Sequence, residues 1–336
     1  MPRTGLNNGF HFDPEVFADY MQEQSVINTR IIESGILVHD PKIQEMVGTS
    51  NNVGTIPFFL SADNETDALN DDGDTDNTPT TLKGSKQTFM AMARMKAWQE
   101  NTFVRYLTGK SPLQNLANNL VVPYYANQWQ LDLLAILAGV TGVTGMADHK
   151  TDIATTGGTV TDDNKLSLTT HIDAGQKALG DKRANLTLFI CHSAVLANLK
   201  KQELITYRAN TDSNAIQSDN IPMFGNMIVI ETDNGTVDAS GTFPVYTSYM
   251  VGRGAFLSAD KEVHLPYNVA YDAETKGGVE KLYTKQAKVF HPNGFSIKAD
   301  DIAKESPTRT ELATVANWEL KFNHKNIPIV KIVSNG

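Results

Sequence analysis

Cysteine is almost absent from this chain, and long apolar runs are missing. The single cysteine, Cys191, excludes an intramolecular disulfide framework and any metal site built from several thiolates. No apolar run comes near the roughly 18 residues that cross a bilayer, and the N-terminus lacks the apolar core of a secretory signal. We therefore expect a cytosolic origin and no membrane contact.

Positive charge is also scarce. The chain has 29 Lys and Arg against 38 Asp and Glu, which gives a net charge of -9. Phosphate contacts need clustered Lys and Arg, so this balance argues against a protein that grips nucleic acid. A protein whose acidic surface faces DNA without binding it remains compatible with this charge balance. The 336 residues, 40% of them apolar, are enough for two or three domains with cores of their own.

The first 50 residues predict a helical arm. Asp13 is a capping carboxylate and Pro14 stands at the first helical position, which is where proline is best tolerated. Apolar side chains follow at helical spacing: Val16, Phe17, Tyr20 and Met21. A second helix-like stretch covers residues 25–34.

An acidic segment, residues 61–81, separates two strand-like runs. It holds seven acidic residues and neither Lys nor Arg, so it cannot pack as a core and is predicted to be a solvated loop. The flanking runs at 55–60 and 87–90 then predict a long hairpin with an acidic tip. Loops of this length inside a compact domain are usually functional or disordered.

A basic stretch follows the acidic one. Its cations are Lys83, Lys86, Arg94, Lys96, Arg105 and Lys110, and Glu100 is the one acid among them. An acidic loop next to a basic stretch suggests that copies of the chain contact one another.

The strongest helical pattern covers residues 111–138. Ser111-Pro112 opens it, apolar side chains recur along it, and Gly139 is predicted to close it. At 1.5 Å per residue, about 28 residues would span roughly 42 Å, which suits a spine better than the core of a small domain. Pro123 is expected to kink or divide this helix.

Residues 161–276 predict an α/β unit in which helices and strands alternate. Predicted strands cover 186–191, 227–231 and 245–251, and predicted helices cover 171–179 and the segment that follows Ser193. The tail adds a strand at 282–290, a short helix near 311–316 and a terminal strand at 327–333. The fold class is therefore α+β.

The residue groups that could carry chemistry have simpler explanations. In Cys191-His192-Ser193, adjacent residues are poorly placed to act as nucleophile and base, so we expect Cys191 to end a buried strand and Ser193 to cap a helix. Gly252-Arg253-Gly254 lacks the third glycine of a dinucleotide fingerprint and predicts a turn. Asp72, Asp74 and Asp76 alternate as in an EF-hand, but Asn77 and Lys83 stand where glycine and glutamate are required. No catalytic residue, cofactor or metal ligand is predicted.

The order of these elements resembles the Hong Kong 97-type capsid fold of tailed bacteriophages. That order is a helical arm, a long hairpin with a charged tip, a long spine helix, an α/β domain and returning strands. The segments that carry the resemblance are 54–58, 91–98, 109–112, 124–125, 133–139, 178–181, 191–195, 306–308, 311–312, 316–319 and 325–327.

The resemblance implies a major capsid protein, which is structural and not an enzyme. Such a subunit forms hexamers and pentamers in an icosahedral shell around double-stranded DNA, located in the virion and assembled in the bacterial cytoplasm. The implied divisions are an N-terminal arm at 1–50, an extended loop at 51–104, a peripheral domain at 105–160 and 277–336 with the spine helix, and an axial domain at 161–276. A separate scaffolding protein, a portal and decoration proteins are the implied partners, without sequence-specific DNA binding.

The same resemblance implies that the hairpin lies over a neighbouring subunit. The candidate contacts between subunits pair the acidic tip, Asp71, Asp72, Asp74 and Asp76, with Arg94, Lys96 and Arg105. Three alternatives remain: an encapsulin-like shell that encloses a cargo enzyme, a soluble α/β enzyme with a distributed site, and a mostly β tail-tube subunit. The long spine helix counts against the last.

Overall fold

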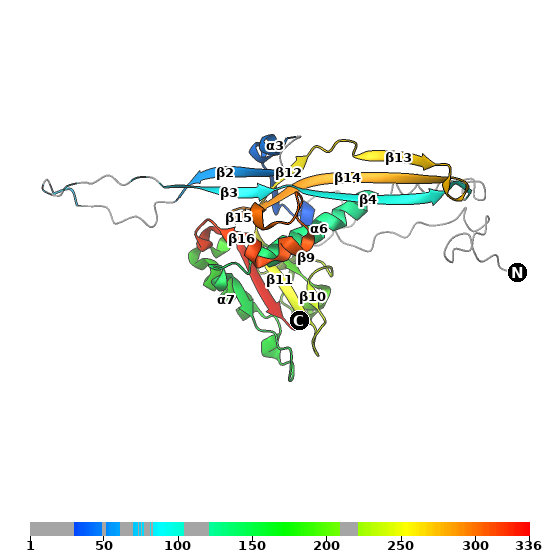
Figure 1. Cartoon of the computed structure of the whole chain (residues 1–336). Coiled ribbons are helices and arrows are strands. Elements are labelled where there is room, and N and C mark those ends of the chain that lie inside the picture. The colour runs from blue at the N-terminus through cyan, green and yellow to red at the C-terminus, as the bar shows by residue number, and fades with distance from the viewer. Residues whose placement is uncertain are drawn as a thin grey trace, which may run out of the picture.

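The computed structural model describes residues 30–48, 52–60, 70–72, 74, 76, 81, 83–103, 121–208 and 221–336. The predicted arm helix at 13–21 and the first ten residues of the predicted spine helix lie outside these residues. The described chain forms an elongated upper layer with a ribbon at one end and a second unit below it (Figure 1).

The upper layer is a sheet built around one long strand, β14 (Val279–Pro292). On one edge β14 pairs with β4 (Met92–Asn101), from Met92 opposite Lys288 to Asn101 opposite Val279. On its other edge it pairs with two strands, β12 (Phe256–Lys261) along its C-terminal part and β13 (Tyr267–Asp272) along its N-terminal part. Strand β1 (Leu37–His39) adds to β12 in parallel.

The lower unit is an eight-stranded sheet in the order β5-β17-β11-β6-β9-β8-β7, with β10 paired to β11. Its centre, β6 (Leu186–Cys191), is an almost continuous apolar run, which is what a strand covered on both faces requires. Leu188 and Ile190 pack in the cluster that contains α6 (Val121–Val140). Phe189 and Cys191, on the opposite face, pack with α7 (Leu168–Leu179) and α8 (Ser193–Lys201).

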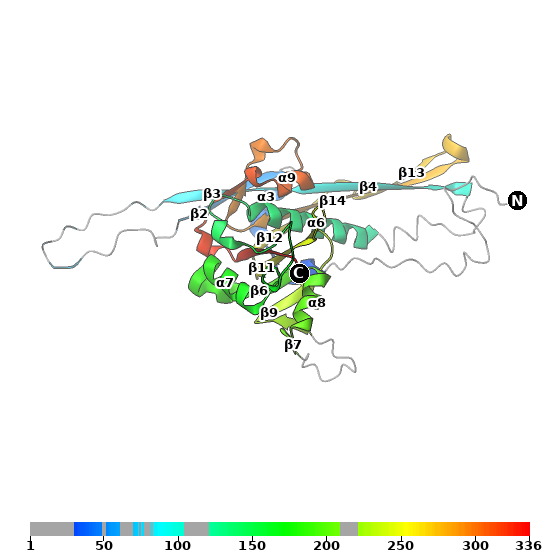
Figure 2. The same ribbon diagram turned by 90° about the horizontal axis from the view of Figure 1, so that it is seen from below.

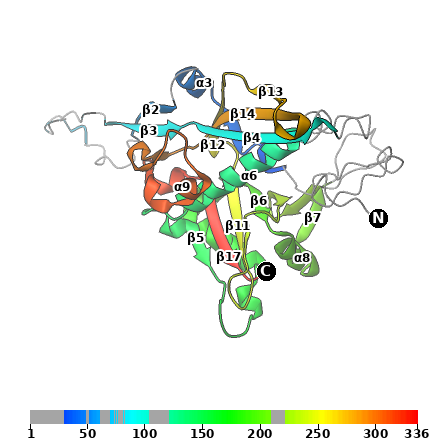
Figure 3. The ribbon, with the colours of Figure 1, turned by 45° about the vertical axis from the view of Figure 1, so that its right-hand side comes forward.

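Helix α6 joins the two sheets. Its side chains Trp129 and Leu133 share one cluster with Phe290 of the upper sheet and Ile190 of the lower one. The helix therefore lies between the layers, as Figures 1 and 3 show. It corresponds to the predicted spine helix from residue 121 onward. Pro123 falls in the first described turn, so the predicted kink or division at Pro123 concerns turns outside the described residues.

The predicted end of the spine helix was wrong by a short distance, since α6 continues through Gly139 to Val140. Gly139 does not end the helix but allows another segment to approach it. A Cβ at this position would overlap the carbonyl oxygen of Leu312 and lie 2.8 Å from Nε1 of Trp318. The indole of Trp318 donates a 2.8 Å hydrogen bond to that same carbonyl, so the C-terminal segment is fitted tightly against the helix.

The predicted hairpin is present but shorter than expected. Strands β2 (Val53–Phe59) and β3 (Gly84–Met90) pair antiparallel from Val53 opposite Met90 to Phe59 opposite Gly84. The run at 91–98, which falls within the predicted extended loop at 51–104, instead belongs largely to β4, and β4 pairs with β14. We call the pair β2 and β3 the ribbon. It leaves one end of the body, while β4 runs toward the other end (Figure 2).

The sheets also divide the chain at other places than the predicted ranges. Strands β12 and β13, from the range 161–276, join the upper sheet with β14. The terminal strand β17 (Ile329–Ser334), from the range 277–336, lies in the lower sheet between β11 and β5. Sequence neighbours thus belong to different layers, because β11 leads out of one sheet directly into β12 of the other.

The remaining elements are short. The helices are α2 (Arg30–Glu33), α3 (Pro41–Val47) and α9 (Arg309–Ala313), and the strands are β5 (Lys150–Asp152), β7 (Ile205–Arg208), β8 (Ile221–Phe224), β9 (Met227–Glu231), β10 (Val237–Asp238), β11 (Val245–Gly252), β15 (Phe295–Ile297) and β16 (Trp318–Leu320). Short 3-10 helices cover Ala147–His149, Asp162–Asn164, Gly180–Asn185, Thr275–Gly277, Ala299–Asp301, Val315–Asn317 and His324–Asn326.

Candidate assembly interface

The ribbon is fixed to the body by a buried amide at its root. Gln87, 3% exposed, accepts hydrogen bonds through Oε1 from Nε2 of His291 at 2.9 Å and from the backbone N–H of Gly294 at 3.0 Å. One residue on, the N–H of Thr88 donates a 2.9 Å hydrogen bond to Oγ of Ser296. These bonds set the position from which β2 and β3 leave the body.

His291 must be neutral to fit this site. Complete burial lowers the pKa of its imidazole to about 3, and Nε2 then carries the proton that Gln87 accepts. A histidine with a lowered folded pKa contributes stability above its unfolded pKa of about 6.5, and that stability is lost as pH falls below 6.5 toward 3.

We expect acid to weaken the root of the ribbon. Between pH 7 and pH 5, His291 alone should lower the free energy of unfolding by about 2 kcal/mol, because only the unfolded chain takes up the proton. His291→Gln keeps a donor toward Gln87 and should flatten the pH dependence by that amount. Urea unfolding at pH 7, 6 and 5 measures both; equal slopes for the two proteins would contradict the assignment.

The acidic tip lies between the ends of β2 and β3. Asp71, Asp72, Asp74 and Asp76 are all exposed. The backbone N–H of Asp74 donates a 3.0 Å hydrogen bond to Oδ1 of Asp72, which is a local turn. These carboxylates form an exposed acidic surface at the tip of the ribbon.

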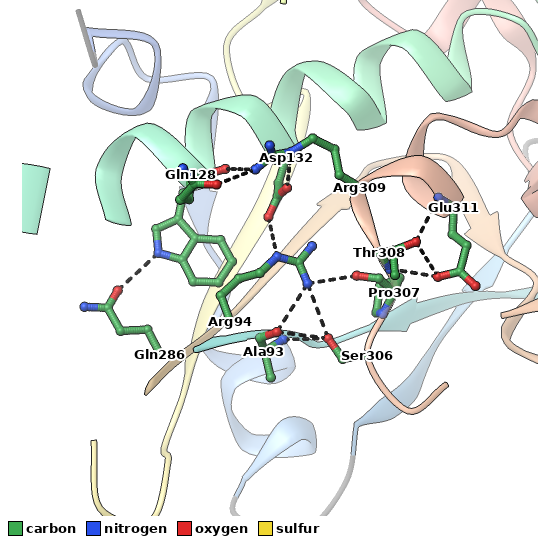
Figure 4. Close-up of polar contacts among 11 residues, drawn as sticks. Ala93, Arg94, Gln128, Asp132, Gln286, Ser306, Pro307, Thr308, Arg309 and Glu311 are labelled. Atoms are coloured by element: carbon green, nitrogen blue, oxygen red, sulfur yellow. Dashed lines mark hydrogen bonds and ion pairs between the residues drawn. The ribbon is translucent and has the colours of Figure 1, made fainter. Parts of the chain in front are cut away.

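Arg94 corrects a prediction, because its guanidinium is used inside its own chain. Nε lies 2.9 Å from Oδ2 of Asp132 in α6, and Nη1 donates a 2.9 Å hydrogen bond to the carbonyl of Pro307 (Figure 4). The Arg94 side chain is only 21% exposed, so it is not a free partner for a neighbouring acidic loop. Since β4 pairs with β14 beneath α6, Arg94 meets the helix and not the solvent.

Asp132 collects two guanidinium groups at a fully buried point. Its Oδ1 lies 2.8 Å from Nε of Arg309, which follows the cap of α9, and its side chain has no exposed surface. Arg309 also donates to the carbonyl and side-chain oxygens of Gln128, one turn earlier in α6 (Figure 4). Three elements distant in sequence, β4, α6 and α9, thus meet on one carboxylate.

This cluster was not predicted, although the sequence holds a signal for it. Asp132 interrupts an apolar run, Leu131-Asp132-Leu133-Leu134, at a position that shares a helix face with Trp129 and Ile136. An acid on the buried face of a helix needs a buried partner. Arg309 lies between Thr308 and Glu311, which form a capping box, so its helix, but not its contact with Asp132, was predictable.

The other predicted cations have different positions. Lys96 is exposed on β4, and only its backbone carbonyl is used, as acceptor for Oγ1 of Thr284 at 3.1 Å. Arg105 lies outside the described residues. Of the three predicted contact cations, Arg94, Lys96 and Arg105, Lys96 is therefore the described one whose side chain is exposed, and β4 runs away from the ribbon (Figure 1).

Cys191-His192-Ser193 is a strand end and a helix cap, as predicted, but the capping residue differs. Nδ1 of His192, not Ser193, accepts the N–H of Ala194 at 3.0 Å, and the N–H of Ser193 donates to Asp233 at 2.9 Å. Oγ of Ser193 lies 3.4 Å from the same Nδ1, whose lone pair already accepts the N–H of Ala194. Burial raises the pKa of the Cys191 thiol to about 12, so the thiol is protonated.

Two negative findings hold for the described part of the chain. Its helices include none that is both long enough and apolar enough to span a bilayer. Its His, Cys, Asp and Glu side chains include no group of three or more that could hold a metal ion. The predicted turn at Gly252-Arg253-Gly254 is confirmed.

Comparison with known proteins decides the family. A family model described as major capsid protein 13-like matches residues 57–328. The chain belongs to this family. It is also 30% identical over 322 residues to the major capsid protein of Bacillus phage SPP1, covering 95% of this chain and 94% of that protein. The chain is thus a phage major capsid protein, a structural subunit whose place is the capsid of the virion.

The fold comparison agrees with the family. The capsid of Ralstonia phage GP4 aligns with a TM-score of 0.60 at 12% identity, over 94% of both chains. The SrpI encapsulin from Synechococcus elongatus aligns with a TM-score of 0.50 at 6% identity, over 97% of this chain and 96% of that one. Phage capsids and encapsulins therefore share the capsid-like fold, and the family model and the SPP1 relative are what assign this chain to the phage group.

Proposed function

We propose that this capsid subunit assembles as hexamers and pentamers into an icosahedral shell that encloses double-stranded DNA. The observation that carries the proposal is the ribbon: β2 and β3 pair with each other and extend from one end of the body, and the segment between them carries exposed carboxylates. A neighbouring copy of the subunit is the natural surface for such an extension to lie on. The net charge of -9 fits a shell that faces DNA without gripping it.

The three layers of the fold supply the divisions of this proposal. The ribbon of β2 and β3 is the extended loop that lies over a neighbour. The upper sheet with α6 and α9 is the peripheral domain, and the lower sheet with α7 and α8 is the axial domain. Residues before β1 form the arm. This assignment keeps the Hong Kong 97-type divisions but moves β1, β4, β12, β13 and β17 to the layers in which they pair.

The proposed subunit acts by assembly and not by catalysis, and needs no cofactor. The capped geometry of His192 and the protonated Cys191 thiol support this, because neither offers an activated nucleophile. The proposed partners are a separate scaffolding protein, a portal and decoration proteins, with assembly in the cytoplasm of the bacterial host.

The contents of purified shells test the phage function against an encapsulin-like one. Shells isolated from infected or induced cells should contain nuclease-protected double-stranded DNA. A protein cargo in place of DNA, found reproducibly by mass spectrometry, would favour the enzyme compartment.

The acidic tip is proposed to pair with Lys96 of a neighbour. We expect conversion of Asp71, Asp72, Asp74 and Asp76 to lysine to reduce shell yield strongly, while the free energy of unfolding of the isolated subunit changes little. Each exposed pair contributes only about 0–1 kcal/mol, so the effect depends on repetition over many interfaces. Shell yield from sedimentation profiles is the measurement.

A charge swap provides the control for this pairing. Adding Lys96→Glu to the four-lysine variant should recover part of the shell yield, and salt of several hundred millimolar should reduce wild-type yield by screening. Asp300→Lys with Asp301→Lys, on an exposed turn elsewhere, is the matched control and should leave yield unchanged. Unchanged assembly of the four-lysine variant would refute the pairing.

A further inference from the structure

A cavity of about 530 Å³ opens beside the start of α6, between the helix and the upper sheet. Most of its lining is apolar: Val122, Ala126 and Trp129 from α6, Phe290 from β14, Ile32 from α2 and Leu37 from β1. Val122 is 65% exposed, although it stands on a helix that is otherwise largely buried. We call this cavity the arm groove.

The position of the arm groove relates it to the N-terminal residues. The described chain begins at Arg30, and Ile32, two residues later, already lines the groove. The described chain thus begins two residues before the lining of the groove. Eight residues, 22–29, separate Arg30 from Met21 and could span up to about 27 Å when extended, so the segment before them can reach any part of the groove.

The chemistry of the arm matches the groove. The sequence predicts a helix that begins at Asp13, with an apolar stripe of Val16, Phe17, Tyr20 and Met21 and acids on its other face. An apolar cavity left open to water is unfavourable, and a short amphipathic helix has little stability until its apolar face is covered. The helix would cover the apolar wall of the groove, and the groove would cover the apolar face of the helix.

We propose that the apolar stripe of residues 16–21 docks in the arm groove of its own chain, with Phe17 against Val122 and Trp129. The short connection through residues 22–29 keeps the stripe at a millimolar effective concentration, which favours its own groove over that of another copy. This contact lies apart from the ribbon and does not depend on the proposed shell, since it forms within the unassembled subunit.

Alkylation of a reporter thiol tests the docking. Val122→Cys places a thiol at the exposed edge of the groove, while the native Cys191 is fully buried. In the full chain we expect its reaction with iodoacetamide to be about tenfold slower than in the Val122→Cys, Phe17→Ser protein, because the docked arm covers it. Asp19→Ser, on the polar face of the predicted helix, is the matched control and should leave the rate unchanged. Equal rates with and without Phe17 would overturn the proposal.

Disulfide formation identifies which chain supplies the arm. Phe17→Cys with Val122→Cys should form a crosslink at the mass of one subunit, whereas Asp19→Cys with Val122→Cys should not. A crosslink that appears only at the mass of two subunits would overturn docking on the same chain. A second sample of the double variant is reduced and tested for shells. If the crosslink forms in the oxidised sample but the reduced sample gives no shells, the proposed function alone is contradicted. If shells form but the crosslink does not, this proposal alone is contradicted.

Discussion

Asp132→Ala is expected to lower the free energy of unfolding of the capsid subunit by about 3 kcal/mol, the lower end of the cost of breaking a buried ion pair by removing one partner, because both arginines keep part of their hydration. The carboxylate has no exposed surface and receives Nε of Arg94 at 2.9 Å and Nε of Arg309 at 2.8 Å. Without it, two guanidinium groups, on side chains that are 21% and 41% exposed, would face each other with no carboxylate between them. Urea unfolding of the isolated subunit measures the change.

An exposed ion pair provides the matched control. Asp162 lies 2.8 Å from Lys165, but its side chain is 96% exposed. Asp162→Ala should therefore cost less than about 1 kcal/mol. If Asp132→Ala proved as mild as Asp162→Ala, the cluster would not hold β4, α6 and α9 together, and α6 would have to be fixed by apolar packing alone.

Shortening the ribbon is expected to abolish shells while leaving the subunit folded. Leu60 and Lys83 are joined by a 2.9 Å backbone hydrogen bond, so an Asn-Gly turn can connect them in place of residues 61–82. The pairing of β2 with β3 stays intact. The free energy of unfolding should be unchanged or higher by up to about 2 kcal/mol, because a shorter loop costs less entropy to close.

A second variant separates the length of the loop from its charge. Replacing residues 61–82 by a Gly-Ser segment of equal length keeps the reach of the ribbon and removes its acids. If charge matters, this variant should also assemble poorly; if reach alone matters, it should assemble well while the short-turn variant fails. Normal shells from the short-turn variant would contradict the assignment of the ribbon as the loop that lies over a neighbour.

Local patterns predicted most single elements. The acidic run at 61–81 predicted a solvated loop, because such a segment cannot be buried. Together with the strand-like runs beside it, this predicted a hairpin, and β2 and β3 pair on either side of the acidic run. The apolar run at 186–191 predicted a buried strand, and β6 is covered on both faces. The turn at Gly252-Arg253-Gly254 also followed from local chemistry.

Pairing between distant segments was not predictable in this way. Met92 lies opposite Lys288, almost 200 residues away, and nothing in the periodicity of β4 names β14 as its partner. The same reason explains why Arg94 was predicted to contact a neighbour: its partners, Asp132 and Pro307, come from two other parts of the chain. His192 replaced Ser193 as the helix cap because its ring reaches the N–H of Ala194, which is a matter of side-chain geometry.

Electron microscopy of the purified subunit, alone and coexpressed with the neighbouring phage genes, tests the assembly proposal most directly. If the subunit assembles as proposed, closed icosahedral shells, or rings of five and six subunits, are expected in at least one of these preparations. A small compact particle that persists under both conditions would contradict it.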